Sequence, residues 1–454
     1  MHRWRRAWRI ECRGPDGGPS NQRPDASLLS RISLMIVFSQ RWIAVAAIAF
    51  ALAGCGGGSD STQPSSTSGG TGTQGGSNGG TNGGSPGGQT GGNGGGSTGG
   101  GTPSLSASAA LVQKLGKPSR VLVGLGSGQS ISDMQSQGIR PDIIDVYLVG
   151  AGPGSWPYWN SPDGAYITYA AQAAQTYGAT PMFTFYQMAQ NGDGNLSGIT
   201  DATFMNTYWS QARLMYQRIA ALNAPVLINL EPDFWGYVWA QAPSHDPTQM
   251  AAVVNSQPEC SSLPNTAAGI GQCLVQMARQ IAPKALIGFP PAFWSGSPTA
   301  VAGEMRAAAA HQADFIVAQT SDRDAGCLEA AAVSECTGRG GTFYWDENNV
   351  NTPNFHQSQT SYLDYRTALG NGLPILWWQT PLGVPSSTPG GTNQHYRDNR
   401  VDYMLRNTQE YGTGHTFAIV FGSGGTYQTT INTDGGQFAR LLGLYLGGGG
   451  ATLQ

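Results

Sequence analysis

The chain has 454 residues, of which 39% are hydrophobic and 11% are charged, and its formal net charge is −3. The hydrophobic share, with 12 Trp, 17 Tyr and 14 Phe, excludes a chain that is disordered throughout. The near balance of charges excludes the basic face that nucleic-acid binders carry, so we expect no nucleic-acid partner.

The first 55 residues have the pattern of a targeting segment. We expect translation to start at Met35, after which Arg41 supplies positive charge and residues 42–53 are mostly apolar. This apolar stretch is shorter than the roughly 20 residues of a membrane span and is typical of a signal peptide. It ends in Leu52-Ala53-Gly54-Cys55, which resembles the bacterial lipoprotein cleavage box. The resemblance implies export and attachment to the cell envelope through a lipid on Cys55 alone; an ordinary signal peptide is the alternative.

Residues 56–103 consist mainly of Gly, Ser and Thr and hold most of the excess among the 66 glycines. Such a composition cannot bury a core and predicts a flexible linker with a reach of roughly 35–40 Å. The remaining residues, 104–454, are numerous enough to bury one substantial core. We therefore expect a leader over 1–55, a linker over 56–103 and a single domain over 104–454, and a monomer.

Four cysteines fall within this domain, as two close pairs. The simplest connectivity is Cys260 with Cys273 and Cys327 with Cys336, which predicts two local disulfides and an oxidising compartment. Zinc ligation is the alternative, but the chain has no CxxC pair and its six His are scattered.

From residue 118 onward, apolar runs of strand type alternate with helical runs. The predicted helices span residues 163–177, 201–221, 265–281, 300–311 and 398–411, and the stretches 235–263 and 323–367 are expected to be insertions. Each strand is nearly continuous in apolar residues, as in a parallel sheet that is covered on both faces. This pattern predicts a (β/α)8 barrel, with a doubly wound sheet as the alternative. The eight predicted strands are Arg120–Gly126, Ile143–Gly150, Thr180–Met188, Pro225–Asp233, Ala285–Trp294, Asp314–Thr320, Leu373–Thr380 and Thr416–Gly422.

The active sites of such barrels lie at the carboxyl ends of the strands. In this chain those ends carry aromatic, amide and carboxylate side chains. Aromatic rings stack on the apolar faces of sugars, and amides and carboxylates hydrogen-bond sugar hydroxyls, so the pattern indicates a carbohydrate ligand. The predicted substrate-binding residues are Tyr147, Tyr186, Gln187, Asn229, Trp235, Trp294, Asp324, Trp378 and Gln379.

The fourth strand ends in Leu230-Glu231-Pro232-Asp233. This sequence resembles the Glu-Pro strand end of many (β/α)8 glycoside hydrolases, in which that Glu is the proton donor. The resemblance implies that Glu231 is the general acid. Glycosidic cleavage needs a second carboxylate, and we expect Asp233 or Asp322 to be the base or to modulate the charge. Asp233 could instead cap a helix, and Asp322 could simply pair with Arg323 in solvent.

These features predict an exported, membrane-anchored glycoside hydrolase that acts on a poly- or oligosaccharide. No residue pattern in the sequence requires a metal or another cofactor. The alternative is a catalytically inert carbohydrate-binding barrel, because the seventh strand ends in Gln379 where many glycoside hydrolases carry a nucleophilic Glu. Another hydrolase, such as a carbohydrate esterase or a metal-dependent deacetylase, would need a His/Asp cluster.

Overall fold

The computed structural model describes residues 105–126, 129–331, 333–337, 343–388 and 390–453. The predicted leader, the candidate lipid site Cys55 and the Gly-rich linker lie outside the described residues.

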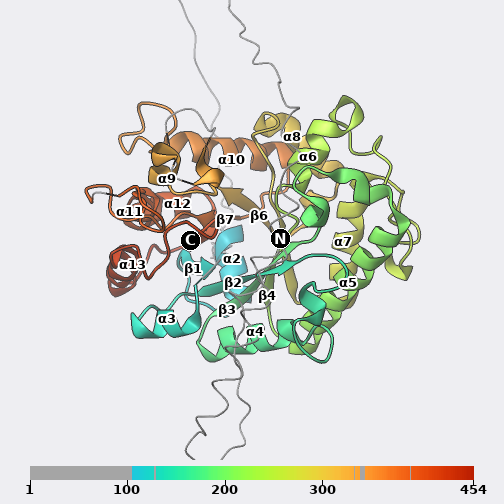
Figure 1. Cartoon of the computed structure of the whole chain (residues 1–454), viewed down its shortest axis with the longest axis horizontal. Coiled ribbons are helices and arrows are strands. Elements are labelled where there is room, and N and C mark those ends of the chain that lie inside the picture. The colour runs from blue at the N-terminus through green and yellow to red at the C-terminus, as the bar shows by residue number, and fades with distance from the viewer. Residues whose placement is uncertain (1–104, 127–128, 332, 338–342, 389, 454) are drawn as a thin grey trace, which may run out of the picture. The chain divides into compact units, whose positions relative to one another are not determined.

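Eight parallel strands form a closed barrel in which each strand pairs with the next in sequence and β8 pairs with β1 (Figure 1). The predicted (β/α)8 barrel and its eight strands are thereby confirmed. The strands are β1 Leu122–Gly126, β2 Ile143–Val149, β3 Thr180–Tyr186, β4 Val226–Leu230, β5 Ala285–Phe289, β6 Phe315–Gln319, β7 Ile375–Thr380 and β8 Thr416–Gly422.

Five strands end earlier than the sequence predicts, and β4 and β5 do so by three residues or more. β4 stops at Leu230, two residues before Pro232, and β5 stops at Phe289, directly before Pro290. Proline has no N–H group to donate to a neighbouring strand, which favours an end of the ladder at these positions. The acidic and aromatic residues beyond these points therefore belong to loops at the barrel mouth or to the start of α6.

The helices lie around the outside of the barrel (Figure 1). Several begin at side chains that cap the first turn: Asp201 accepts from two backbone N–H groups of α5, and Thr266 and Asn354 do the same for one N–H group each in α7 and α10. The helices are α2 Ala107–Lys114, α3 Ile131–Ser136, α4 Ala165–Thr176, α5 Ala202–Leu222, α6 Phe234–Gln241, α7 Ala267–Ile281, α8 Pro298–Ala307, α9 Ala325–Ala330, α10 Phe355–Leu369, α11 Arg400–Arg406, α12 Thr408–Thr413 and α13 Gln437–Gly447. None of the helices in the described part of the chain combines the length and the apolarity that crossing a membrane requires.

Two predicted helices are shorter or divided. The helix predicted over 300–311 ends at Ala307, because Ala309 adopts a left-handed backbone before a short 3-10 turn. The helix predicted over 398–411 splits into α11 and α12 at Asn407, whose side chain donates to the carbonyl of Tyr403. Asn side chains compete in this way with helical hydrogen bonds.

The stretch 323–367, predicted as an insertion, is only partly one. Its last 13 residues form most of α10, which packs against α8 and leads into β7. α10 therefore belongs to the ring of barrel helices, and the inserted part is the segment before it.

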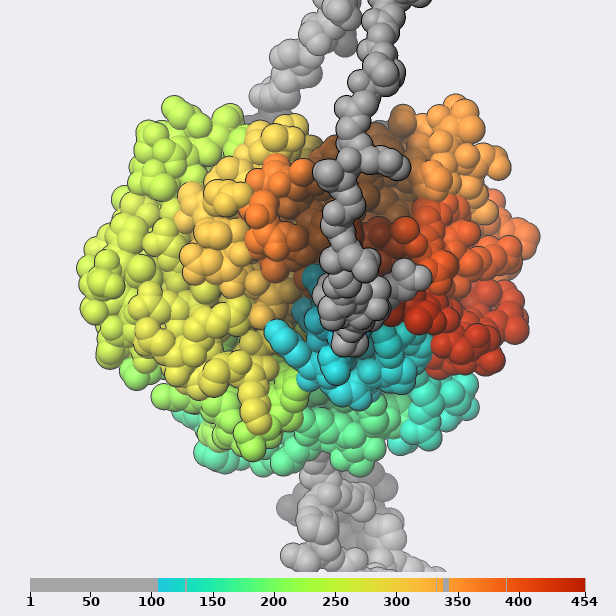
Figure 2. Space-filling view, turned by 180° about the vertical axis from the view of Figure 1, so that it is seen from behind, coloured from blue at the N-terminus to red at the C-terminus, as the bar shows by residue number. Residues whose placement is uncertain are grey.

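The first and last described segments meet where the barrel closes. The backbone N–H of Val121 donates to the carbonyl of Ala451, and the Ser108 hydroxyl in α2 donates to the carbonyl of His415, just before β8. α2 thus lies across the amino-terminal end of the barrel. Figure 2 shows the cyan segment that contains α2 at the surface, beside the red carboxyl-terminal segment.

The same end of the barrel is held by a largely buried ion pair. Arg120 donates to both carboxylate oxygens of Asp142 at 2.7 and 2.8 Å, and Asp142 also accepts from the backbone N–H of Val123 at 2.9 Å. We expect Asp142→Ala to lower the free energy of unfolding by about 3 kcal/mol, because it leaves the guanidinium without its partner. Urea-induced unfolding measures this change.

The matched control is the more exposed pair of Asp402 and Arg406 on α11, whose side chains are 23% and 65% exposed. Asp402→Ala should cost less than about 1 kcal/mol, since an exposed ion pair contributes little. Equal effects of the two substitutions would contradict the role assigned to Asp142.

Candidate active site

The barrel interior is polar near the carboxyl ends of β2 and β3. The Thr184 hydroxyl on β3 lies within hydrogen-bond distance of both carboxylate oxygens of Asp145 on β2, at 3.0 and 3.1 Å. Trp378 on β7 reaches the same carboxylate from across the barrel, with its indole N–H donating at 2.9 Å. Burial raises the pKa of Asp145 to about 7. This carboxyl group therefore holds its proton up to near-neutral pH.

Tyr147 and Gln379 lie next to this network, nearer the mouth. The Gln379 side-chain amide donates to the Tyr147 hydroxyl at 2.8 Å, and the Tyr147 ring packs on Trp378 with centroids 5.9 Å apart. Gln379 has a φ of 53° and follows a shift in the β7–β8 register. This distortion lets the consecutive residues Trp378 and Gln379 both face the barrel interior.

A small recess that opens to solvent lies beside these residues, between the loop after β3 and the start of α6. Its walls include the Tyr186 and Tyr237 rings and the carboxylates of Asp193 and Asp233. The Tyr186 hydroxyl donates to Asp193 at 2.6 Å. The described residues that line the recess include no Lys, Arg or His. Across the described ranges, no group of three or more His, Cys, Asp and Glu is placed to hold a metal ion.

Asp233 has the features of a functional carboxylate. It precedes α6 but makes no capping hydrogen bond, so the expectation that it only caps a helix does not hold. Its φ of 65° is strained for a residue with a side chain. Burial raises the pKa of Asp233 to about 6, and the nearby carboxylates of Asp193 and Asp322 add to the rise. Such a group can be protonated in mildly acidic solution and still exchange its proton readily.

Glu231 lies behind the recess. It is fully buried, and one carboxylate oxygen accepts from the backbone N–H groups of Gln187 and Met188, both at 3.0 Å. Burial raises the pKa of Glu231 to about 8, although these N–H groups and the nearby Tyr208 hydroxyl offset part of the rise. Glu231 is not among the residues that line the recess. In this arrangement it anchors the loop after β3.

Two of the three predicted amide residues, Gln187 and Asn229, are also buried. The Gln187 side chain donates to the carbonyl of Gly150 at 2.6 Å and to Gln211. Asn229 is paired in register with Thr184, and neither atom of its amide has a hydrogen bond among the described residues. Gln187 thus joins the loops after β2 and β3, and Asn229 lies within the polar interior.

The three predicted tryptophans differ in exposure, and Trp378 is buried. Trp235 is 1% exposed, its indole N–H donates to the carbonyl of Leu230 at 3.0 Å, and it packs on Phe289, so it belongs to the core. Trp294 is 57% exposed and contacts Tyr237 edge-on, with centroids 5.0 Å apart. Only Trp294 presents a ring to a ligand.

The residues after β6 separate into two groups. Asp322 pairs with Arg323 at 3.0 Å, and the same guanidinium donates to the carbonyl of Gly424 after β8. Asp322 lies near enough to Asp233 to raise its pKa. Asp322 therefore belongs to the mouth, with its charge partly neutralised.

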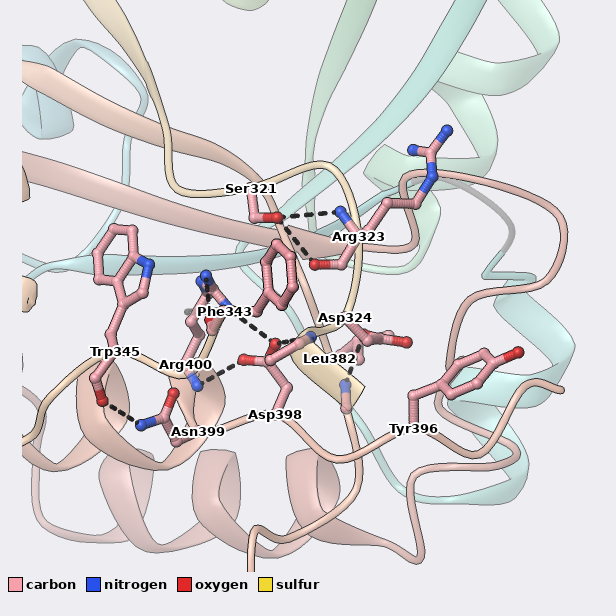
Figure 3. Close-up of polar contacts among 12 residues, drawn as sticks. Ser321, Arg323, Asp324, Phe343, Trp345, Leu382, Tyr396, Asp398, Asn399 and Arg400 are labelled. Carbon is pink, nitrogen blue, oxygen red and sulfur yellow. Dashed lines mark hydrogen bonds and ion pairs between the residues drawn. The ribbon is translucent and has the colours of Figure 1, made fainter. Parts of the chain in front are cut away.

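Asp324 does not reach the mouth. It is fully buried and accepts from the backbone N–H groups of Gly383 and Thr429, at 3.2 and 2.7 Å. Asp398 beside it accepts from Arg400 (Figure 3). These contacts tie together the loops after β6, β7 and β8. Burial, together with repulsion from Asp398, raises the pKa of Asp324 to about 7.

Both predicted disulfides are confirmed. Cys260 is bonded to Cys273, and Cys327 to Cys336. The second lies in a small hydrophobic cluster, separate from the main core, that includes Tyr396. Two disulfides are typical of a protein that folds in an oxidising compartment outside the cytoplasm.

Four site residues were not predicted: Asp145, Thr184, Asp193 and Tyr237. Asp145 could have been recognised as a site residue from the sequence, because it is a charged residue in an apolar strand. It lies two positions before Tyr147, on the same face of the strand. Asp193 could not have been recognised, since it lies in a Gly-rich loop whose path depends on tertiary contacts.

The sequence matches no family model and no curated protein. Solved structures that resemble the fold include a Cellulomonas fimi endo-β-1,4-mannanase double mutant, with 11% identity, 74% of each chain covered and a TM-score of 0.43. A GH113 β-1,4-mannanase has 10% identity, covers 72% of this chain and 98% of its own, and has a TM-score of 0.42. A Methylomonas sp. D-allulose 3-epimerase has 11% identity, 74% and 93% coverage and a TM-score of 0.36. Likenesses this low carry no argument about function.

The buried carboxyl groups predict a pH-dependent stability. The pKa values of Asp145 and Glu231, about 7 and about 8, lie above the values of about 4 in an unfolded chain. The folded state therefore holds protons that the unfolded state has lost, so these groups lower the free energy of unfolding as pH rises from about 4 to about 8. We expect a lower urea midpoint at pH 8 than at pH 5.

Glu304 on α8 provides a variant for this test. Neither of its carboxylate oxygens has a hydrogen bond among the described residues, and burial raises its pKa to about 8. Glu304→Gln should flatten the pH dependence, whereas Glu335→Gln, at an exposed position, should leave it unchanged. A urea midpoint that rises from pH 5 to pH 8 would contradict the prediction.

Proposed function

We propose that the barrel hydrolyses glycosidic bonds in a poly- or oligosaccharide, with carboxylates of the recess as acid and base. The observation that carries this proposal is Asp233, whose backbone is strained and whose carboxylate makes no hydrogen bond that caps α6. Asp233 and Asp193 both line the recess. Tyrosine rings beside it offer faces for sugar stacking, and a carboxylate pair supplies the proton transfers that glycosidic cleavage needs.

Asp233 is the proposed proton donor. Its pKa of about 6 leaves a protonated fraction in mildly acidic solution. Asp193 and Asp322 are the candidates for the second carboxylate, because both act on Asp233 electrostatically. Glu231 is then a positioning residue that holds the Gln187–Met188 backbone, and its predicted role as the acid is tested below.

We further propose that the protein is exported and held in the envelope through a lipid on Cys55. The two disulfides support export, and the sequence at Leu52–Cys55 supports the lipid. On this proposal, the linker over residues 56–103 gives the barrel the reach to meet an extended glycan. Labelling of the protein with a radioactive fatty acid in a bacterial host, lost in Cys55→Ser, tests the anchor.

The proposed acid predicts different effects of two neighbouring substitutions. Asp233→Asn should lower kcat by about 10²- to 10⁴-fold on whichever polysaccharide the protein cleaves, because Asn cannot donate the proton. Glu231→Gln should lower kcat less than about tenfold, since a Gln carbonyl can accept from the same two N–H groups. The measurement is reducing-end release from mannan, xylan, β-glucan, chitin and chitosan.

The reverse pattern, with a large loss in Glu231→Gln and a small one in Asp233→Asn, would return the acid role to Glu231. No release from any substrate, with saturable binding to one of them, would instead favour the inert carbohydrate-binding barrel.

The pH profile tests the electrostatic coupling. If Asp233 is the acid, kcat/KM should fall about tenfold per pH unit above about 6. Because Asp193 raises the pKa of Asp233, Asp193→Asn should move this descending limb to lower pH. Tyr186→Phe should move the limb the other way, to higher pH, because the Tyr186 hydroxyl lowers the pKa of Asp233. An unmoved limb in Asp193→Asn would contradict the coupling.

A further inference from the structure

Three aromatic side chains continue outward from the recess. Tyr237 on α6 lines the recess and contacts the ring of Trp294, which lies in the loop after β5 and is 57% exposed. Trp239 lies two residues further along α6 and packs half-buried against the same loop, at Gly296. Single exposed aromatic residues are common, but the contacting pair of Tyr237 and Trp294 beside a recess marks a binding surface. We call Tyr237, Trp294 and Trp239 the aromatic platform.

Two glycines allow the tryptophan rings of the platform to pack closely against the backbone. The ring of Trp294 lies so close to Gly236 of α6 that a Cβ there would be 2.4 Å from it. The ring of Trp239 lies similarly close to Gly296, where a Cβ would be 2.8 Å away. Each segment thus offers a glycine to the tryptophan of the other. The loop after β5 and the helix after Asp233 are held together by this reciprocal packing, and the rings are set in place.

The outer end of the platform is also supported. His245 stacks on Trp239 with centroids 4.6 Å apart and planes 8° from parallel, and its Nδ1 lies 2.7 Å from the Trp239 carbonyl oxygen. The described residues of the platform carry no charge, whereas the recess carries two carboxylates. The surface therefore changes from acidic to aromatic with distance from Asp233.

We propose that the aromatic platform binds successive sugar rings of a polysaccharide whose target bond lies at the recess. This inference rests on the proposed function and adds to it that the substrate is a polymer. Tyr237 belongs to both surfaces, and the indole of Trp294 is open to solvent. Pyranose rings stack their apolar faces on such aromatic rings. A disaccharide in the recess would leave the platform unused.

The inference predicts that affinity depends on chain length. The probes are the biose and hexaose of the manno-, cello- and chito-series, and their dissociation constants are measured by calorimetry with the whole protein. For at least one series, Trp294→Ala should weaken hexaose binding about tenfold or more and leave biose binding unchanged. Tyr169→Ala, which removes a partly exposed ring from α4, is the matched control and should change neither.

Gly236→Ala is the second variant. It favours the helix locally, because Ala has a higher helix propensity than Gly, but its Cβ displaces the Trp294 ring and the Ala292 side chain of the same loop. It should therefore reproduce the loss of hexaose affinity in a protein that remains folded. Circular dichroism confirms the fold.

The outcomes separate this inference from the proposed function. Hydrolysis that is retained, with hexaose affinity unchanged in both variants, overturns the platform and leaves the hydrolase standing. Hexaose binding that depends on Trp294 without any hydrolysis supports the platform and overturns the hydrolase. Failure of all three hexaoses to bind overturns the platform.

Discussion

The pairing of β8 with β1 is the constraint on which the rest of this structure depends. Five residues of each strand are in register, from Leu122 opposite Ala418 to Gly126 opposite Gly422. Closure satisfies the backbone groups of both edge strands and brings eight strand ends into one ring. Residues more than two hundred positions apart, such as Asp145 and Trp378, thereby become hydrogen-bond partners.

Closure also raises the pKa values of the carboxyl groups that it encloses. Carboxyl groups enclosed by the barrel and its loops are removed from water, which disfavours their charged form. Burial therefore dominates the raised pKa values of Asp145, Glu231 and Asp233, with repulsion among carboxylates as a smaller contribution at Asp233. Burial of these carboxyl groups lowers the stability of the fold, as is often the case at functional sites.

The backbone at the strand ends is also strained. Glu231, Asp233 and Gln379 all have left-handed φ values, between 53° and 65°. Residues with side chains avoid this region, and each such position costs roughly 1–3 kcal/mol. At Gln379 the consequence is that two consecutive residues face the interior. At Glu231 the carboxylate is buried against the loop after β3, and Asp233 is left to line the recess.

The sequence by itself determined the barrel, its eight strands and both disulfides. Strand periodicity and Cys spacing are local properties, so they can be recognised before the chain is folded. It also placed the polar and aromatic residues at the correct end of the strands. It did not show which of them a ligand can reach. Trp235 and Asp324 are buried in structural contacts, whereas Trp294 is open to solvent.

Only the tertiary structure decided which carboxylates meet. The recess combines Asp193 from a loop after β3 with Asp233 from the end of β4. Asp145 meets Trp378 in the polar interior only because the barrel closes. The physical reason is that a side chain's direction, burial and pKa depend on backbone torsions and on neighbours from distant segments, and neither is contained in local sequence.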